Sequence, residues 1–298
     1  MGLGEIFALI CALLWASAVV LYKYAGDSMS ANSLNLVKNI VGLSLLLPTA
    51  WYVEGAVMPT LSTYSWLIVI ASGYLGIAVA DTLYLQALRT IGASRTAIVG
   101  SLYSPFVVLL SMLFLAERLA GWQWFGFIMV LAGIMVVVYQ RSQKELDPGL
   151  LVKGAFYAST SVFLTAAGVV AMKPILSDET SDGAFFWLVT LRMLAGIVGM
   201  LIYLLVTKKL ATTYAVIVGE QHKWRTIVLA SFLGSYLALL FWLAGFKYAD
   251  ASVASVLNET ANVFIVIMAA IFLSEALTKR KIAGVVLTFS GVLIFLGL

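Results

Sequence analysis

Two stretches of this sequence repeat each other, and the repeat limits the possible folds more than any other feature. Residues 84–138 and 242–296 align without a gap at a spacing of 158 positions, and eleven of the 55 aligned positions are identical. The identical pairs include Glu117 with Glu275, Gly126 with Gly284 and Gly133 with Gly291. Apolar segments resemble one another by composition alone, but composition does not superpose a glutamate and two glycines. We infer an internal duplication, which predicts two related halves.

The composition predicts an integral membrane protein. Hydrophobic residues make up 62% of the chain and charged residues 11%, whereas about a quarter of residues are charged in soluble domains. The unbroken apolar runs have the length of membrane-spanning helices and exclude a β-barrel. Cys11 is the only cysteine, which excludes an intrachain disulfide, and His222, the only histidine, lies in a polar loop. The net charge of +4 is spread over short loops and does not imply nucleic acid as a partner.

The apolar runs predict ten helices, five in each half. They cover about residues 3–22, 31–53, 64–88, 94–115 and 121–140, then 154–172, 183–206, 226–247, 251–273 and 282–298. The polar stretch 141–149 separates the halves, so we divide the chain into residues 1–145 and 146–298. An odd number of helices per half forces the second copy to enter the membrane upside down. The predicted fold is therefore an all-α membrane protein built as an inverted repeat.

The loop charges predict the orientation in the membrane. With Lys38 and Arg192 set aside as intramembrane residues, the loops after the odd-numbered helices hold thirteen Lys and Arg, and those after the even-numbered helices hold three. Positive charge favours the cytoplasmic side. We therefore expect the odd loops in the cytoplasm and both termini outside it.

The paired signatures LFLAERL and IFLSEAL, each followed by two glycines seven residues apart, carry a family resemblance. The chain resembles the drug/metabolite transporter superfamily and, within it, the ten-helix EamA-type transporters. The resemblance implies a basket in which helices 1–4 and 6–9 surround a central cavity and helices 5 and 10 lie at the periphery. It also implies secondary transport across the cell (inner) membrane, often export of amino acids or related metabolites.

A polar stripe in the ninth predicted helix is the first candidate site. Ser255, Asn258, Glu259 and Asn262 follow helical spacing and share one face. The matching positions of the fourth helix are small, namely Ala97, Gly100, Ser101 and Ser104, with Pro105 next. A bulky polar face opposite a small, kinkable one would leave room for a solute near the midplane. The alternative is that these side chains join helices, or that Glu259 neutralises Arg192.

Ionisable residues elsewhere in the spans extend the candidate site, since each is costly in a bilayer. Lys38 and Arg192 occupy equivalent places in the second and seventh helices, where a cation could bind a substrate carboxylate, pair with an acid, or in the case of Lys38 extend to the surface. Asn35 and Asn39 lie within a turn of Lys38. Asp81 could pair with Arg95 or Lys38 as a gate, or simply reach the interface.

Aromatic and signature residues have structural readings as well. Trp15, Tyr84, Tyr103, Tyr236 and Trp242 could line a cavity, or could anchor and pack helices. We read Glu117 and Glu275 as structural, each complementing the N-terminus of the helix that follows it. The glycines behind them suit close packing of the peripheral helices.

We therefore predict a secondary transporter of a small polar or amphipathic metabolite such as an amino acid. The sequence has no phosphate-binding loop and no metal cluster, so we expect no cofactor and no metal. Glu259 in an apolar setting could exchange a proton near neutral pH, which makes protons a possible coupling ion, although uncoupled movement fits nearly as well. The alternative function is a flippase or carrier of a lipid-linked intermediate. A membrane enzyme is disfavoured because no partner base accompanies Glu259, and we expect a monomer or a homodimer.

Overall fold

The computed structural model is all-helical over the residues it describes, which are 1–25, 29–56, 58–138, 147–178, 184–219, 222–272 and 278–298. No strand occurs in those ranges. In chain order the helical elements are α1 (Leu3–Ala25), α2 (Ala31–Glu54), α3 (Thr63–Gly73), the π-helix η1 (Tyr74–Ala80), α4 (Asp81–Ile91), α5 (Ala93–Gly100), α6 (Tyr103–Phe114), α7 (Gly121–Val138), α8 (Pro148–Ser177), α9 (Phe185–Val206), α10 (Leu210–Gly219), α11 (Trp224–Ser231), the π-helix η3 (Phe232–Ala238), α12 (Leu239–Tyr248), α13 (Ala251–Asn258), α14 (Ala261–Phe272) and α15 (Lys279–Leu296).

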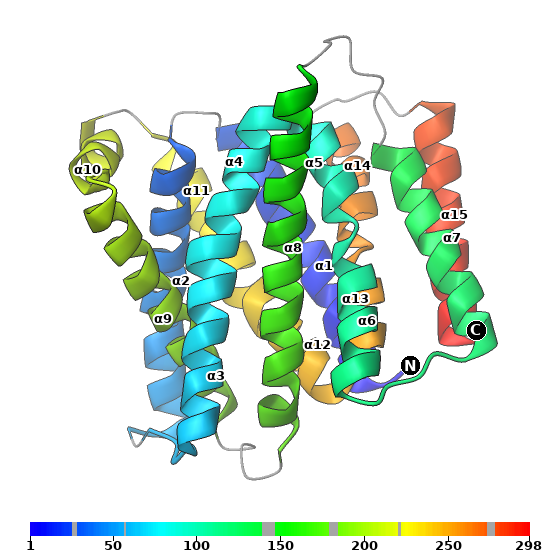
Figure 1. The fold of residues 1–298 in the computed structure, drawn as a ribbon, viewed down its shortest axis with the longest axis horizontal. Helices are drawn as coiled ribbons and strands as arrows, with labels where there is room; N and C mark the ends of the chain where they lie inside the picture. The colour runs from blue at the N-terminus through cyan, green and yellow to red at the C-terminus, as the bar shows by residue number, and fades with distance from the viewer. Residues whose placement is uncertain (26–28, 57, 139–146, 179–183, 220–221, 273–277) are drawn as a thin grey trace.

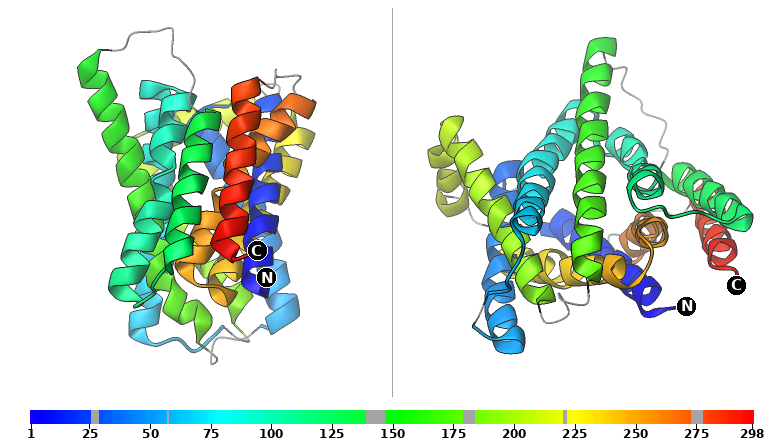
Figure 2. Two further views of the ribbon diagram at one scale, coloured as in Figure 1. Left: turned by 90° about the vertical axis from the view of Figure 1, so that its right-hand side faces the viewer. Right: turned by 60° about the horizontal axis from the view of Figure 1, so that its bottom comes forward.

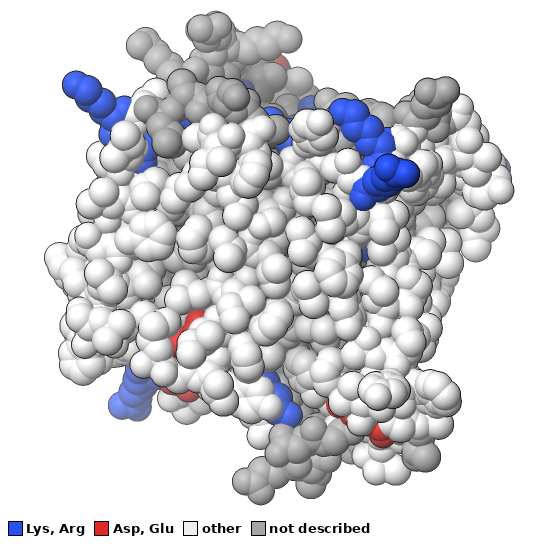
Figure 3. Space-filling view, turned by 180° about the vertical axis from the view of Figure 1, so that it is seen from behind, with Lys and Arg blue, Asp and Glu red and all other residues white. Residues whose placement is uncertain are grey.

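Eight described helices are long and apolar enough to span a bilayer, and Ile98–Phe114 and Leu210–Gly219 are shorter apolar helices. Helices suit this environment because they satisfy every internal backbone group without water. Figure 3 shows the corresponding surface, a broad belt almost free of charged side chains with charges near its two ends. The chain is a multi-pass membrane protein.

One helix was missed by the sequence prediction. The stretch after the seventh apolar run was assigned to a loop, but ten of its residues form α10 (Leu210–Gly219), which lies at the upper left edge of Figure 1. Its ten residues are too few to cross the apolar core of a bilayer, so it did not stand out as a span.

The helical elements recur with the same spacing as the sequence repeat. The bounds of α5, α6 and α7 lie 158 positions before those of α13, α14 and α15. The seven-residue π-helices η1 and η3 are also 158 positions apart. π-Helices are rare, so their presence at one repeat position in both halves makes a chance match implausible.

The helices form two bundles that exchange segments between the halves. Bundle A consists of α1 and α2 together with α11, η3, α12, α13 and α14, and bundle B consists of α8 and α9 together with α3, η1, α4, α5 and α6. The first two helices of each half thus pack against the middle helices of the other half (Figures 1 and 2). The bundles meet through α2 against α9, α6 against α13, and α8 against α12.

α7 and α15 pack against each other at one side of the molecule, at the right of Figure 1. A Cβ atom on Gly126 would lie 2.7 Å from the carbonyl oxygen of Gly291, and one on Gly133 would lie 2.8 Å from that of Gly284. Neither approach leaves room for a side chain. The expected close packing of the signature glycines is confirmed, and it joins α7 to α15.

Two carboxylates clamp the bundles together at the end of the molecule that carries both chain termini, which we call the clamp end (Figure 1). Glu117 accepts hydrogen bonds from the Ala251 and Ser252 backbone N–H groups at 2.7 and 2.9 Å and from the Ser252 hydroxyl at 2.6 Å. Glu54 accepts from the backbone N–H groups of Phe186 and Trp187 at 2.9 Å each.

The partner predicted for Glu117 from the sequence was therefore wrong. We expected it to complement α7, the helix that follows it, but the carboxylate caps α13 of the other half. The turn between Phe114 and Gly121 directs Glu117 toward bundle A, where free N–H groups at a helix start attract a carboxylate. Glu275 lies outside the described residues.

Lys173 and Asp250 extend the Glu117 clamp. The Lys173 ammonium donates to the carbonyl oxygens of Lys247 and Ala249 at 3.4 and 2.7 Å, next to Asp250. Burial and the nearby Glu117 carboxylate raise the pKa of Asp250, and the charge of Lys173 opposes that rise. The charged form of the Asp250 carboxylate is therefore less stable in the folded protein than in the unfolded chain.

Replacing Glu117 with alanine is predicted to destabilise the protein. Loss of a charged cap that accepts three hydrogen bonds costs about 2 kcal/mol, so we expect the thermal unfolding midpoint to fall by several degrees. Intrinsic tryptophan fluorescence in detergent measures the midpoint. Glu5→Ala serves as the control, because it removes a partly exposed carboxylate whose partners, the Gly2 amide and the N-terminal ammonium, lie at the chain start. Equal midpoints for the two variants would contradict the clamp.

Asp250→Asn is predicted to stabilise the protein near neutral pH and to lose this advantage in acid. A folded-state pKa above the unfolded one means that protonation stabilises the fold, and this stabilisation is absent above the folded pKa. The variant should therefore melt slightly above the parent at pH 7, and the two should converge as the pH falls through the raised pKa. A midpoint difference that does not change with pH would rule out this assignment.

Candidate functional site

Two helix breaks at equivalent repeat positions define the centre of the candidate site. Ser101 and Leu102 interrupt the path from α5 to α6, and Glu259 and Thr260 interrupt the path from α13 to α14. The second break is a tight turn in which the Asn262 amide donates to the Glu259 carbonyl at 3.1 Å. Because α6 packs on α13, the breaks bring half-helix ends from both bundles together.

Glu259 lies buried at the second break, with 5% of its surface exposed. The Asn262 side-chain amide donates to its carboxylate at 2.9 Å, and the backbone amide of Ser104 at the start of α6 also faces it. Both Glu259 and Arg192 are described, and no ion pair joins them. The alternative that Glu259 neutralises Arg192 therefore does not take the form of a direct ion pair in this structure, and it stays a prediction.

Several buried polar atoms beside Glu259 have no hydrogen-bond partner in the described structure. They are the Tyr103 hydroxyl, the Ser104 hydroxyl and both ends of the Asn258 amide. Tyr103 lies near Glu259 and Trp242. Buried polar groups are nearly always paired with protein or water, so a group of unpaired ones indicates where a solute or water can bind.

Arg192 on α9 forms the other side of this centre and is 3% exposed. Its Nε donates to the Ser72 hydroxyl at 2.9 Å, and its guanidinium lies 5.1 Å from the centroid of the Trp242 ring. A Cβ atom on Gly76 would come within 2.9 Å of the guanidinium Nη2. The absence of a side chain at Gly76, inside η1, makes room for the cation.

Ser72 and Gly76 were missed by the sequence reasoning. They are four residues apart, so they share a helix face, and both are small. A pair of small residues in a helix next to a buried cation was the available signal. This pair could not be assigned to Arg192, because the sequence does not tell which helix lies opposite Arg192.

Lys38 and Asp81 form a second polar cluster and link α2 of bundle A to α4 of bundle B. The Lys38 ammonium lies 3.1 Å from Asp81 Oδ2, with the side chains 18% and 34% exposed, and 5.9 Å from the centroid of the Trp15 ring. Lys38 and Arg95 were both considered as partners of Asp81, and the structure shows the ion pair with Lys38. Asn39 donates to Asn35 at 3.0 Å behind this pair.

The remaining candidates divide between the two clusters. Tyr84 on α4 lies near both Asp81 and Glu259. The hydroxyl groups of Ser101 and Ser255 donate to backbone carbonyls three residues earlier, at 2.7 and 2.9 Å. Ser101 also contacts Met135 of the peripheral α7. These two serines are buried but have already used their hydrogen-bond donors.

The described residues contain no group of three or more His, Cys, Asp or Glu side chains that could hold a metal ion. The polar centre instead combines a carboxylate, a guanidinium, amides, hydroxyl groups and aromatic rings. Such a set can hydrogen-bond and stack on a small organic solute.

Comparison with known proteins agrees with this architecture. A solved crystal structure superposes with a TM-score of 0.77 over 98% of this chain and 95% of that chain, at 18% sequence identity, which shows a shared fold. An uncharacterized transporter of Archaeoglobus fulgidus is 23% identical over 296 residues, which cover 98% of this chain and 97% of the relative.

Two further relatives match over shorter stretches. One is an uncharacterized transporter of Archaeoglobus fulgidus, 34% identical over 88 residues that cover 28% of this chain and 32% of the relative. The other is an uncharacterized transporter of Bacillus subtilis, 24% identical over 144 residues that cover 48% of this chain and 45% of the relative. The chain thus aligns with less than half of the length of these two relatives. The EamA-like transporter family model matches residues 2–139 and again residues 152–297, so this chain belongs to the EamA-like transporter family of the drug/metabolite transporter superfamily.

Proposed function

We propose that this chain is a secondary transporter that moves a small polar or amphipathic metabolite, such as an amino acid or a derivative, across the cell (inner) membrane. The observation that carries the proposal is the polar centre at the helix breaks, where side chains of both bundles converge and several polar atoms remain unpaired. Ionisable residues inside membrane-spanning segments are costly and mark substrate and ion pathways, and Glu259 and Arg192 are two such residues at this centre.

The proposed architecture is ten spans in two inverted five-helix halves, residues 1–145 and 146–298, around a central site. Three observations support it: the shared 158-residue spacing of the helices, the matching π-helices, and the two separate family matches. Inverted halves can exchange conformations, so the site can open to either side in turn. In this chain the two bundles are the units that would move.

Polar contacts join the bundles at several points, in addition to the apolar packing of α2 on α9, α6 on α13 and α8 on α12. Lys38 bonds to Asp81, Arg192 lies over Trp242, and Glu259 faces Ser104, each across the boundary between the bundles. The clamp carboxylates Glu117 and Glu54 also cross it. Movement of the bundles relative to each other would require exchange of these polar contacts for contacts with a solute or with water.

The chemistry of the centre favours a solute that carries a carboxylate together with an amino group or an apolar part. Arg192 is always charged and presents several N–H donors, which suits a carboxylate. The Glu259 carboxylate suits an ammonium group, and the Trp242 and Tyr103 rings suit an apolar side chain. The charge distribution over the loops favours external termini and is compatible with export.

A flippase or carrier of a lipid-linked intermediate remains the second candidate. The observation that favours it is a recess that opens sideways between α4 and α9. A purified protein that translocates a labelled lipid-linked compound, and none of the soluble metabolites, would establish this alternative and remove the first.

Glu259→Gln is predicted to abolish proton-driven transport while leaving exchange intact. Glutamine keeps the hydrogen bond to Asn262 but cannot gain or lose a proton. The substrate would first be identified by its effect on the melting temperature of the purified protein. In proteoliposomes with a pH gradient we expect uptake to fall about tenfold or more, while exchange of internal for external substrate at equal pH continues.

The control for Glu259→Gln is Glu5→Gln, which removes a carboxylate near the chain start. Gradient-driven uptake that survives in Glu259→Gln would refute proton coupling through this residue. In that case facilitated movement would replace coupled movement, with the same polar centre.

Arg192 is predicted to recognise the substrate carboxylate. Wild-type protein should bind the carboxylate ligand more tightly than its amide analogue, roughly 10- to 100-fold, and Arg192→Gln should lose this preference. Arg192→Lys should retain part of it, because the charge stays and the planar donor fork is lost. Isothermal titration of the ligand pair against the three proteins gives the ratios directly. An unchanged preference in Arg192→Gln would assign the guanidinium a structural role.

A further inference from the structure

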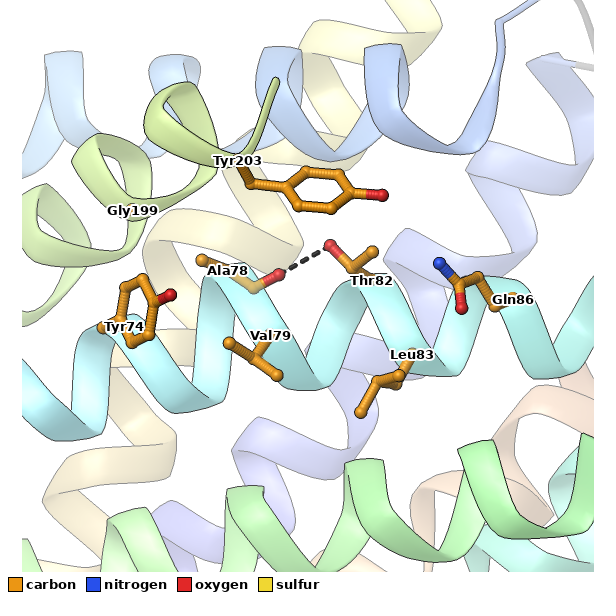
Figure 4. A pocket seen from close by; sticks show the side chains of 8 residues that line it. All are labelled: Tyr74, Ala78, Val79, Thr82, Leu83, Gln86, Gly199 and Tyr203. Carbon is orange, nitrogen blue, oxygen red and sulfur yellow. Dashed lines mark hydrogen bonds between the residues drawn. The ribbon is translucent and has the colours of Figure 1, made fainter. Parts of the chain in front are cut away.

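A recess lies between η1 and α4 on one side and α9 on the other, away from the polar centre. It encloses about 140 Å³. Figure 4 shows the Tyr203 ring projecting over it from α9, with Ala78 and Thr82 facing that ring from η1 and α4. The Thr82 hydroxyl donates to the Ala78 carbonyl at 2.6 Å, so its proton is not available to a ligand. The walls are mostly apolar.

The size and setting of the recess select its occupant. A cavity of about 150 Å³ admits a benzene ring, so this recess has room for a hydrocarbon segment. It opens on the apolar belt, where Tyr74 is 44% exposed and Leu83 is partly exposed. The molecules available at that surface are lipids, whose acyl chains match the walls.

Three cations lie close in sequence to residues that line the recess, although none of them lines it. The Lys209 ammonium lies 6.0 Å from the centroid of the Tyr203 ring, and Lys208 directly precedes it at the end of α9. Arg89 lies three residues after the lining residue Gln86, so it continues the same face of α4. All three cations are exposed. They belong to the loops that hold most Lys and Arg of the chain and that the loop charges predict to be cytoplasmic, the side on which anionic lipids attract basic residues.

We propose that this recess is a binding site for an anionic phospholipid, with an acyl chain between α4 and α9 and the phosphate at Lys208, Lys209 and Arg89. The lipid occupies the seam between α9 and η1. Gly196 and Gly199 let α9 approach η1 there, and Arg192 lies on the same face of α9 one turn earlier. A lipid bound at this seam stabilises the packing that also positions Arg192. The site is independent of the identity of the transported molecule.

The test measures melting temperature in delipidated detergent solution with added phosphatidylglycerol or phosphatidylcholine of the same acyl chains. Phosphatidylglycerol should raise the midpoint at lower concentration than phosphatidylcholine. Lys208→Ala combined with Lys209→Ala should weaken the apparent affinity for phosphatidylglycerol about fivefold for each lysine removed. Both side chains are exposed, so the lipid-free midpoint should hardly change.

Two matched variants separate this site from general electrostatic attraction. Lys153→Ala removes an exposed ammonium that lies 5.9 Å from the Tyr157 ring on α8, the same geometry at another place, and should leave the affinity unchanged. Leu83→Phe fills the recess without a change of charge and should weaken phosphatidylglycerol binding, seen also as less lipid retained in native mass spectrometry.

Equal effects of the two lipids on wild-type protein would overturn the proposal, and so would a loss in Lys153→Ala as large as in the double variant. Unchanged affinity in Leu83→Phe would do the same. A last measurement uses fluorescent phosphatidylglycerol in proteoliposomes. Translocation that Leu83→Phe blocks would make the recess a path for lipid cargo and would overturn the proposal of a resident lipid. Failure of the transport predictions for Glu259 and Arg192 would leave these lipid results unaffected.

Discussion

A polar group inside a bilayer-spanning helix must find its partner within the protein, because hydrocarbon offers none. Arg192 meets this constraint through Ser72, the space at Gly76 and the face of Trp242. Lys38 meets it through Asp81. The contacts of Arg192 fix α9 against η1 and α12, and the Lys38–Asp81 pair fixes α2 against α4. The glycines and the π-helices are the local devices that make these approaches possible.

The clamp carboxylates have hydrogen-bond partners within the protein, whereas several polar groups at the centre have none. At the clamp end the Glu117 and Glu54 carboxylates each satisfy the free N–H groups of a helix in the opposite bundle. At the helix breaks the hydroxyl groups of Tyr103 and Ser104 and the Asn258 amide remain unpaired. Separation of the bundles at the clamp end has to break both clamps, whereas the centre already has unused hydrogen-bonding capacity for a solute.

The sequence predicted the helical fold because apolar run length and the duplicated register depend only on local residue order. It also predicted the close packing of Gly126 and Gly133, since glycine spacing on one helix face is a local property. The sequence did not predict contacts between helices that are far apart along the chain. Glu117 was expected on α7 and caps α13, and Ser72 and Gly76 could not be assigned to Arg192, because the repeat gives no rule for which half supplies the neighbouring helix. The short helix α10 was not predicted, because its length resembles that of a loop.

The central claim is that the polar centre lies on a water-accessible transport path and is more than a set of helix contacts. The most direct measurement is thiol labelling with a small, membrane-impermeant methanethiosulfonate in a Cys11→Ala background, in vesicles of both orientations. Asn262→Cys reports on the centre, and Thr288→Cys, at a fully buried position in the middle of α15, is the matched control. The account predicts labelling of Asn262→Cys and none of Thr288→Cys. Absence of labelling at both positions in both orientations would contradict it.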